Sequence, residues 1–321
     1  MTRTVLITGG TGSFGQACTE TLLDRGVRVI VFSRDELKQS EMARTFQVAV
    51  ADGRLRFFLG DVRDLPRLRR AFEAGPDLVI HAAALKHVPA CEYNPFEALK
   101  TNVLGAVNVI EAALDCEVPK VVALSTDKAV APLNAYGKSK AMAESLFVRG
   151  NGYAGDRLTR FSVVRYGNVL GSRGSVVPLF LEQRASGVVR ITDQRMTRFW
   201  MTLPVAVDFV LGAAEMMQGG EIFVPKIPAA RVRDVAGAIA PDCAIVETGI
   251  RPGEKLHELL IAGEEAAQTF RVRGGSYVIA PANPTWPFVV DAGADPVPPD
   301  FTYSSEHELR PVLFRGFEPC A

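Results

Sequence analysis

The sequence predicts an α/β protein with a Rossmann-like, doubly wound parallel sheet and a smaller C-terminal substrate domain. Short apolar runs typical of buried strands alternate with helix-like segments over roughly the first half of the chain, and this alternation is typical of a doubly wound sheet. The first apolar run, residues 5–7, leads into a glycine-rich turn and then a helix-like segment to about Arg25. That order is found in βαβ units that bind dinucleotides.

Composition excludes several classes of protein. Hydrophobic residues make up 48% of the 321 residues and charged residues 22%, which is sufficient for a sizeable core. Lys plus Arg and Asp plus Glu both number 36, so the net charge gives no support for a nucleic-acid partner. The five cysteines include no CxxC and the four histidines no HxxxH, which predicts reduced thiols and no metal site. We expect a cytoplasmic protein without a membrane partner, because neither a signal peptide nor an apolar run of about 18 residues is present.

The turn after the first strand carries Gly9, Gly12 and Gly15 at GxxGxxG spacing. Glycines let the backbone approach a pyrophosphate, whose charge lies against the helix N-terminus. A purely structural turn is the alternative, but the flanking strand, helix and next strand (residues 27–32) favour dinucleotide binding. The candidate cofactor-binding residues of this turn are Gly9, Thr11, Gly12, Ser13, Phe14 and Gly15.

The second strand ends at Ser33 and Arg34, with Lys38 one turn later. A protein that prefers NAD usually carries Asp or Glu here for the ribose 2′-hydroxyl. A hydroxyl and two cations suit a 2′-phosphate instead, so the sequence favours NADP over NAD. The alternative is a solvated helix start, which the neighbouring Asp35 and Glu36 support.

Two further strand–helix units follow. A strand at residues 55–59 precedes Asp61, which either accepts a hydrogen bond from adenine or caps the predicted helix at residues 65–74. The strand at residues 77–81 precedes three small alanines, which would let a cofactor lie against the backbone. A long helical pattern at residues 95–116 includes a polar asparagine, which is either a cofactor contact or a buried structural group. The candidate cofactor residues here are Asp61, Val62, Ala82, Ala83, Ala84, Lys86 and Asn102.

The next predicted strand, residues 121–124, runs into the sequence STDK (125–128), and a helix begins near Tyr136. Ligands bind beyond the carboxyl ends of the strands in an open parallel sheet. Tyr136 and Lys140 share one helix face because they are four residues apart. The candidate catalytic residues are Thr126, Asp127, Lys128, Tyr136 and Lys140, and Ser125, Tyr136 and Lys140 are also candidate cofactor contacts.

After a sixth strand at residues 161–165, the chain changes character. A glycine-rich loop at residues 166–175 offers backbone amides to a phosphate just before Val176. Residues 203–217 predict an apolar helix, and residues 221–224 predict a seventh strand.

The remaining segments predict a charged turn at residues 251–255, a helix at residues 256–261 and an extended loop at residues 281–299. The expected domains are a dinucleotide-binding domain at residues 1–167 and 202–226, and a substrate domain at residues 168–201 and 227–321.

Seven motifs occur in order: TGGTGSFG (8–15), HAAALKHVP (81–89), STDKA (125–129), YGKSK (136–140), GNVLGSRGSV (167–176), MTRFWMT (196–202) and RPGEKLHE (251–258). Over roughly residues 1–262 the chain therefore resembles the extended short-chain dehydrogenase/reductase superfamily. Within it, the chain looks like the soluble UDP-N-acetylglucosamine 4,6-dehydratases that invert C5. Lysine after Thr-Asp is specific, because related dTDP-glucose dehydratases have glutamate there. Tyr136 favours the inverting type, because membrane-bound relatives that retain C5 often have Met.

The resemblance implies a reaction without net redox change: C4 is oxidised, water leaves across C5–C6, and the hydride returns to C6. Tyr136 takes the 4-hydroxyl proton, and Lys140 favours its phenolate. Lys128 removes the C5 hydrogen, so its pKa must fall from the ordinary value of about 10.4. Protonated Asp127 donates to the departing 6-hydroxyl, and Thr126 hydrogen-bonds O4.

The resemblance also implies that UDP-N-acetylglucosamine is the small-molecule substrate. Arg198 and Arg251 are expected to meet the diphosphate, because guanidinium groups match phosphate oxygens. Glu254 is expected to bind the uridine ribose; the alternative for Arg198 and Glu254 is a solvated charge. The candidate substrate-binding residues are Lys86, Thr126, Asn168, Gly174, Ser175, Val176, Thr192, Arg198, Arg251 and Glu254.

Two other hypotheses stay open. One is a retaining dehydratase or a nucleotide-sugar 4-epimerase on the same scaffold; an epimerase needs Tyr136 but not the pair of Asp127 and Lys128. The other is an NADP-sensing binding protein without catalysis, which need not keep Tyr136, Lys140, Asp127 and Lys128 together. Relatives of this type form dimers or hexamers, so a homo-oligomer is expected.

Overall fold

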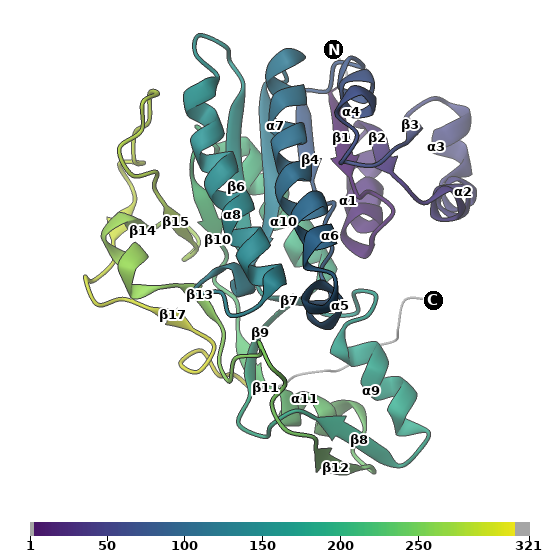
Figure 1. The fold of residues 1–321 in the computed structure, drawn as a ribbon, viewed down its shortest axis with the longest axis vertical. Helices are drawn as coiled ribbons and strands as arrows, with labels where there is room; N and C mark the ends of the chain where they lie inside the picture. The colour runs from purple at the N-terminus through teal and green to yellow at the C-terminus, as the bar shows by residue number, and fades with distance from the viewer. Residues whose placement is uncertain (1–2, 312–321) are drawn as a thin grey trace.

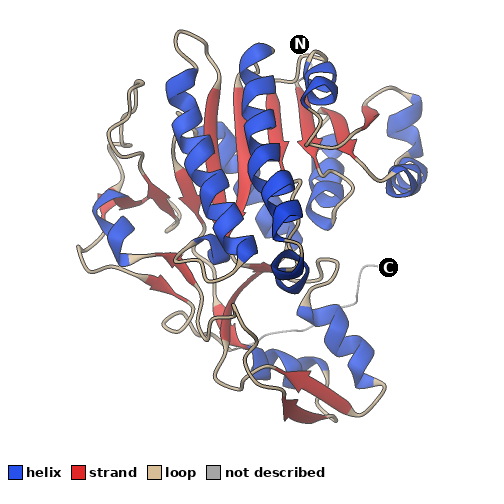
Figure 2. Ribbon diagram, in the orientation of Figure 1, coloured by secondary structure: helices blue, strands red, loops and turns tan. Residues whose placement is uncertain are grey.

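A ten-stranded sheet runs through the computed structural model, which describes residues 3–311 (Figures 1 and 2). Residues 1–2 and 312–321, which include Cys320 and the outer ends of both expected domains, lie outside the described residues. From edge to edge the strands are β16 (Asp295–Pro296), β14 (Thr269–Arg271), β15 (Tyr277–Ile279), β10 (Ile222–Val224), β6 (Arg160–Tyr166), β5 (Lys120–Thr126), β4 (Leu78–His81), β1 (Thr4–Thr8), β2 (Arg28–Ser33) and β3 (Leu55–Leu59).

The strands from β10 to β3 are parallel, so the predicted fold class is confirmed. Their apolar runs are buried on both faces, as helices on both sides of a parallel sheet require. The predicted seventh strand is β10, which pairs with β6. All these strands point their carboxyl ends at one edge, where the binding crevice of such a sheet lies.

Helices cover both faces of the parallel strands (Figure 2). On one face of the sheet, the hydrophobic core is formed with α1, α2, α3 and α10. On the other face, the core is formed with α4, α7 and α8. The helices of this part are α1 (Ser13–Asp24), α2 (Glu36–Thr45), α3 (Gln47–Ala51), α4 (Leu65–Phe72), α5 (Val88–Tyr93), α6 (Pro95–Ala98), α7 (Gly105–Asp115), α8 (Ala135–Gly150) and α10 (Leu203–Met216).

The long helix expected at residues 95–116 is interrupted. A π-helical segment, η1 (Leu99–Leu104), separates α6 from α7. Such segments are rare and often lie beside functional sites. The segment carries Asn102, which is 1% exposed and points its amide at the loop after β4.

Smaller sheets gather below the carboxyl ends of the parallel strands (Figure 1). A core that includes Phe180, Trp200 and Val235 holds two of these sheets and two helices together. The elements are β7 (Asn168–Val169), α9 (Val176–Arg184), β8 (Val188–Ile191), β9 (Thr197–Met201), β11 (Ala229–Arg231), α11 (Val232–Ile239), β12 (Ala244–Glu247), β13 (Leu259–Ile261) and β17 (Tyr303–Ser304).

The helix expected at residues 256–261 is wrong. Residues 259–261 instead form β13, which pairs antiparallel with β17. The short apolar run fits a strand as well as a helix, and pairing with a distant segment decides between them. Leu260 and Ile261 are fully buried by this arrangement.

The expected substrate domain also differs from the observed strand pairing. β14, β15 and β16 lie between residues 269 and 296, yet they continue the large sheet from the free edge of β10. An unpaired edge of β10 would leave backbone groups without partners, and this antiparallel addition satisfies them. The boundary between the two expected domains otherwise stays a prediction.

We expect buried His81 to make the stability of the protein depend on pH. Its Nδ1 lies 2.8 Å from Thr8 Oγ1, and burial lowers its pKa from 6.5 to about 3, with a smaller contribution from Lys140. Below the unfolded pKa the unfolded chain binds a proton that the folded chain does not bind, so stability falls as pH falls.

The wild-type free energy of unfolding should therefore decrease more steeply between about pH 6 and about pH 4 than that of His81→Asn, by up to about 1.4 kcal/mol per pH unit. Denaturant unfolding at several pH values measures both slopes. Equal slopes would show that His81 takes up a proton in the folded protein.

Candidate active site

The catalytic candidates lie where β5 ends and α8 begins. A short 3₁₀ helix, η2 (Asp127–Ala129), follows β5, and Asn134 caps α8 by accepting a hydrogen bond from Gly137 N at 2.8 Å. This cap explains why the helix begins next to Tyr136, as the sequence predicts. The turn between them is tight: a Cβ on Gly137 would lie 2.2 Å from the carbonyl oxygen of Lys128.

Asp127 and Lys128 form a pair at the end of β5. Lys128 Nζ donates to Asp127 Oδ1 at 3.0 Å, and Thr126 Oγ1 donates to the same oxygen at 2.9 Å. Asp127 is fully buried, and its Oδ2 has no hydrogen-bond partner among residues 3–311. The structure therefore brings three predicted catalytic residues together and leaves one carboxylate oxygen free for a ligand.

The charge of Lys128 differs from the expectation. Burial alone lowers its pKa, but the carboxylates of Asp127 and Glu258 outweigh burial and raise it, while Arg198 opposes them. In the absence of a ligand the lysine is thus an ammonium, and the predicted lowering of its pKa is wrong for this state. The sequence could not indicate this, because Glu258 comes from a segment 130 residues away.

Glu258 was not among the predicted site residues. Its Oε1 lies 3.6 Å from Lys128 Nζ, and its side chain is 3% exposed. The only signal in the sequence is its position at the end of the charged motif RPGEKLHE.

Tyr136 is buried beside this pair. Burial raises the pKa of its phenol to about 12, and Lys128 and Thr126 partly offset that effect. The cation that acts on Tyr136 is Lys128 and not the predicted Lys140. Lys140 Nζ instead donates to Leu124 O at 2.6 Å, and burial lowers its pKa to about 8, against the opposing effect of Glu144.

The glycine-rich turn has the shape that a dinucleotide requires. Gly9 adopts φ +69°, and a Cβ there would lie 2.8 Å from the backbone of Ala83. A Cβ on Gly15 would lie 2.4 Å from Gly10 Cα, so α1 packs directly on the turn. Within the described residues, no side chain caps the N-terminus of α1 at Gly12. Free helix amides beside a bare backbone surface fit a pyrophosphate.

Other cofactor candidates surround this turn. The hydroxyl of Ser125 is buried without a hydrogen-bond partner in the described part of the chain, at the end of β5. Ser13 Oγ accepts a hydrogen bond from Arg173 N at 3.0 Å, which joins the turn to the later glycine-rich loop. Ser125 lies at the carboxyl end of β5, and Ser13 lies just after the glycine-rich turn that follows β1. The positions of these residues in the sequence motifs predict this placement. The remaining cofactor candidates near this turn are buried or half-buried; they are Thr11, Phe14, Val62, Ala82 and Ala84.

Asp61 does not have one of the two roles considered for it. Asp64, and not Asp61, caps α4 by accepting from Arg67 N at 3.0 Å. Asp61 pairs with Arg63 at 2.8 Å and with Arg34 at 3.6 Å. The alternative of a helix cap is therefore wrong, and the contact of Asp61 with adenine stays a prediction.

Asn102 serves the loop after β4. Its Oδ1 accepts from Leu85 N at 2.8 Å, and its Nδ2 donates to Leu85 O and Ser139 Oγ, both at 2.9 Å. The alternative of a buried structural group therefore describes Asn102, because both hydrogens of its amide already bond to protein atoms. Lys86, which follows Leu85 in the chain, donates from Nζ to Arg173 O at 2.8 Å.

The residues proposed to bind a 2′-phosphate lie at the end of β2. Arg34 is 56% exposed, and Lys38 pairs with Asp35 at 2.6 Å. The Asp35 carboxylate also accepts from Lys38 N and so caps α2. Ser33 Oγ accepts from Gln39 Nε2 at 3.0 Å.

Arg198 does not occupy the expected position for a diphosphate contact. It is 7% exposed, and it donates to three backbone carbonyls: Thr197 O at 2.7 Å, Leu256 O at 3.1 Å and Lys255 O at 3.0 Å. Its guanidinium is therefore neither solvated nor free. Arg198 is buried between β9 and the segment before β13. This burial explains why its guanidinium is neither solvated nor placed to meet a diphosphate.

Other substrate candidates are better placed. Lys128 Nζ donates to Asn168 Oδ1 at 3.4 Å, so β7 faces the catalytic pair. Ser175 precedes α9 without capping it by a side-chain bond, and its buried Oγ has no partner within the part of the chain that the structure describes. Amides at Val176 are thus available to a phosphate.

The rim of the site carries the last candidates. Gly174 adopts φ +70°, and a Cβ there would meet His87 Cε1 at 2.4 Å. Arg251 is 60% exposed, and its guanidinium lies 4.0 Å from Glu254. Thr192 lies half-buried after β8, and no hydrogen bond within residues 3–311 joins its side chain to the other candidates.

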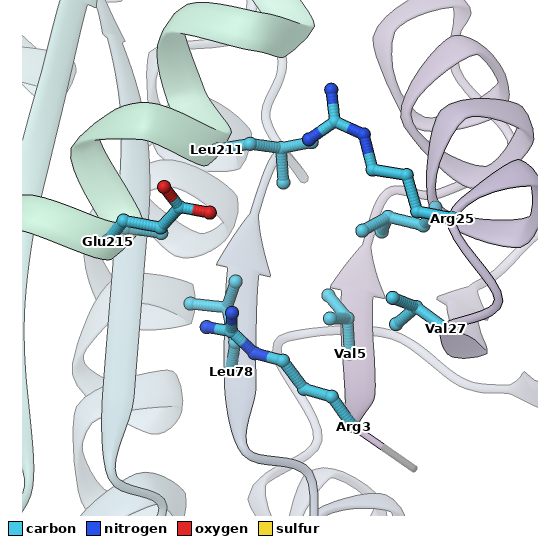
Figure 3. Close-up of a pocket in the computed structure, with 9 residues that line it drawn as sticks. Arg3, Val5, Arg25, Val27, Leu78, Leu211 and Glu215 are labelled. Carbon is cyan, nitrogen blue, oxygen red and sulfur yellow. The ribbon is translucent and has the colours of Figure 1, made fainter.

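A cavity of about 110 Å³ lies at the opposite end of the strands (Figure 3). Arg3, Val5 and Leu78 line it at the amino ends of β1 and β4, so it has no part in the site. Within residues 3–311, no group of His, Cys, Asp or Glu side chains could hold a metal ion. None of the helices described is long and apolar enough to cross a membrane.

Comparisons with known proteins agree with this geometry. Residues 5–279 match a family described as "Polysaccharide biosynthesis protein". A UDP-N-acetylglucosamine 4,6-dehydratase (inverting) of Campylobacter jejuni is 50% identical, over 87% of this chain and 83% of the relative. A UDP-glucose 4-epimerase of Rickettsia conorii is 45% identical, over 84% and 81%. The solved structure of Pen from Bacillus thuringiensis is 36% identical with a TM-score of 0.88, covering 96% of this chain and 94% of that one.

We expect Gly137→Ala to disturb the end of β5. The added methyl would clash with the Lys128 carbonyl at 2.2 Å, and overpacking of this kind costs about 1–3 kcal/mol of stability. Denaturant unfolding measures the loss. Gly212→Ala is the matched control, because Gly212 lies in α10 with nothing within 4 Å of a Cβ. A variant of Gly137 as stable as that control would contradict the tight packing.

Proposed function

The chain belongs to the polysaccharide biosynthesis protein family, and from that premise we propose that it is a UDP-N-acetylglucosamine 4,6-dehydratase that inverts C5. The single observation that carries the proposal is the hydrogen-bonded pair of buried Asp127 and half-buried Lys128 beside Tyr136. Water loss from a sugar needs an acid and a base on neighbouring atoms. This pair supplies both within 3.0 Å.

The residues of the chain then divide the proton transfers. When bound, a nicotinamide cofactor takes the C4 hydride and later returns it to C6. Tyr136 accepts the proton of the 4-hydroxyl, so its pKa, raised by burial to about 12, must fall in the complex. The positive charge of Lys128 already lowers the pKa of Tyr136 against burial, and an oxidised nicotinamide would act in the same direction.

The Asp127–Lys128 pair becomes reactive by an internal shift. One proton passes from Lys128 Nζ to Asp127 Oδ1 along their 3.0 Å hydrogen bond. The amine is then the base for the C5 hydrogen, and the carboxylic acid is the donor to the 6-hydroxyl. The elimination itself needs no proton from solvent, because one transfer creates both partners. After the hydride reaches C6, a solvent-derived proton bonds to C5 from the face opposite Lys128, which inverts the configuration.

A 4-epimerase is the competing function, since one relative carries that name. An epimerase moves a hydride at C4 and leaves C5 and C6 intact, so it has no use for a second acid–base pair. Here the two residues are hydrogen-bonded to each other, Asp127 is buried, and Lys128 contacts β7. The dehydratase is therefore the better-supported proposal, and the retaining dehydratase is separated from it by the stereochemistry at C5.

The proposed cofactor is NADP. Asp35, the carboxylate nearest to the end of β2, already caps α2 and pairs with Lys38. Arg34 is left exposed with one long ion pair, and such a pair contributes at most about 1 kcal/mol. A 2′-phosphate can displace it and gain a charge-assisted hydrogen bond. The expected homo-oligomer and cytoplasmic location also stay predictions.

The decisive experiment is NMR of the product formed from UDP-N-acetylglucosamine in D₂O. We expect a 4-keto-6-deoxy sugar that carries solvent deuterium at C5 with inverted configuration. Product with unchanged C6 and no deuterium at C5 would favour the epimerase, and retained C5 configuration would favour the retaining dehydratase. Cofactor binding without any turnover would support the sensing protein.

Lys128→Ala serves as the internal comparison in that experiment. Loss of the base should reduce dehydration about 10²–10⁴-fold, while cofactor affinity stays unchanged because Lys128 is not one of the candidate cofactor-binding residues. Product formation at the wild-type rate would refute the assignment of Lys128 as the base.

Arg34→Ala should weaken NADP by about tenfold and NAD much less, because it removes one charged contact to the 2′-phosphate. Titration calorimetry with both dinucleotides measures the two changes. Arg54→Ala is the matched control, since Arg54 is an exposed arginine paired with an aspartate in the same half of the sheet. An equal loss for NADP and NAD in Arg34→Ala would remove the argument for the 2′-phosphate.

A further inference from the structure

Glu258 is a buried carboxylate that the proposed reaction does not use. Its side chain is 3% exposed, and it lies directly before β13. Two hydrogen bonds fix its backbone: its N donates to Ser305 Oγ, and Ser305 N donates to its O, both at 2.9 Å. The side chain therefore points into the protein from a rigid main chain.

Three cations surround this carboxylate at ion-pair distance. Oε1 lies 3.6 Å from Lys128 Nζ and 3.9 Å from Arg198 Nε, and Oε2 lies 3.7 Å from Lys255 Nζ. All three distances exceed that of a hydrogen bond, and Oε2 has no hydrogen-bond partner among the residues described. A buried charge without hydrogen bonds is unfavourable unless it is paired, so its position calls for a role.

Two of these cations, Arg198 and Lys255, spend their hydrogen bonds on backbone carbonyls and contribute only their charge to Glu258. Among the described residues, Lys128 is the one cation at ion-pair distance from Asp127. The two carboxylates beside Lys128 therefore differ: Asp127 is hydrogen-bonded to the lysine, and Glu258 faces it across a longer gap together with two further cations.

We propose that Glu258 is a positioning residue that stabilises the ammonium formed when Lys128 takes the C5 proton. The inference rests on the proposed dehydratase function. In the step itself, the C5–H bond breaks, its proton bonds to Lys128 Nζ, and the electron pair stays in the sugar, delocalised onto the 4-keto oxygen. Asp127 is protonated at that moment and offers no negative charge, so Glu258 is the carboxylate that remains to balance the new cation.

The charged and titratable groups that face Lys128 come from several elements. They are Asp127 in η2, Tyr136 in α8, Arg198 in β9 and Glu258 in the segment before β13. Removing the charge of Glu258 takes away one of the two carboxylates that oppose Arg198, which lowers the pKa of Lys128. The active pair then loses its shared proton more easily, so the alkaline limb of the pH–rate profile moves to lower pH.

The test compares Glu258→Gln with Glu264→Gln, a matched control on an exposed side chain in the following 3₁₀ helix. Rates of deuterium entry at C5 and of product formation are measured from UDP-N-acetylglucosamine in D₂O across a pH series. For E258Q we expect kcat to fall about 10–100-fold with KM within about twofold. Its alkaline limb should move down by about one pH unit, and E264Q should match the wild type.

Each outcome decides the proposal. E258Q with the wild-type kcat and alkaline limb overturns it, and so does a kcat loss with an unmoved limb, which indicates a merely structural role. If E258Q does not fold by circular dichroism, the same profile is measured in E258D, which keeps the charge at a greater distance. For E258D, a lower kcat together with a downward shift of the alkaline limb of less than one pH unit supports the proposal. Wild-type kcat and an unmoved limb in E258D overturn it. A wild-type enzyme that puts no deuterium into C5 overturns the proposed function as well.

Discussion

A lysine ammonium held between two carboxylates inside the protein is the constraint on which the site depends. Lys128 lies at the end of β5, where Asp127 is its neighbour in the chain and Glu258 approaches from a distant segment. The close packing of Gly137 on the Lys128 carbonyl fixes the backbone, and Asn168 accepts from Nζ. Sheet, helix and C-terminal segment thus converge on one nitrogen atom.

The charges of this cluster are arranged so that protons can move while the total charge stays constant. Burial alone would favour a neutral amine, but Asp127 and Glu258 raise the pKa of Lys128 and keep it an ammonium in the ligand-free site. Tyr136 responds to the same cluster, because Lys128 is the cation that lowers its pKa against burial. The oxidation and elimination steps are therefore electrostatically linked through Lys128.

Local sequence predicts those parts of the molecule that depend on local pattern. The apolar runs mark the parallel strands, and the glycine spacing, STDK and the Tyr136–Lys140 spacing place their residues at one edge of the sheet because they follow strand ends. Long-range pairing is what the pattern misses. The pattern predicts a helix where β13 lies, because its partner β17 is some forty residues away. For the same reason the predicted direction of the Lys128 pKa shift is wrong, and the burial of Arg198 could not be predicted, since both depend on the segment that contains Glu258.

Pairing between β13 and β17 gives the C-terminal segment an influence on the site, although this segment lies outside the seven sequence motifs. Ser305 holds the main chain of Glu258, and Thr197 Oγ1 lies 2.7 Å from the same serine hydroxyl. Two residues earlier, Tyr303 is buried, and its hydroxyl bonds to the backbone of Ile227 at 2.8 and 2.9 Å. A segment that contributes no group to the chemistry thus anchors the carboxylate that faces the catalytic lysine, so truncation of the chain before this segment would release Glu258 from its position.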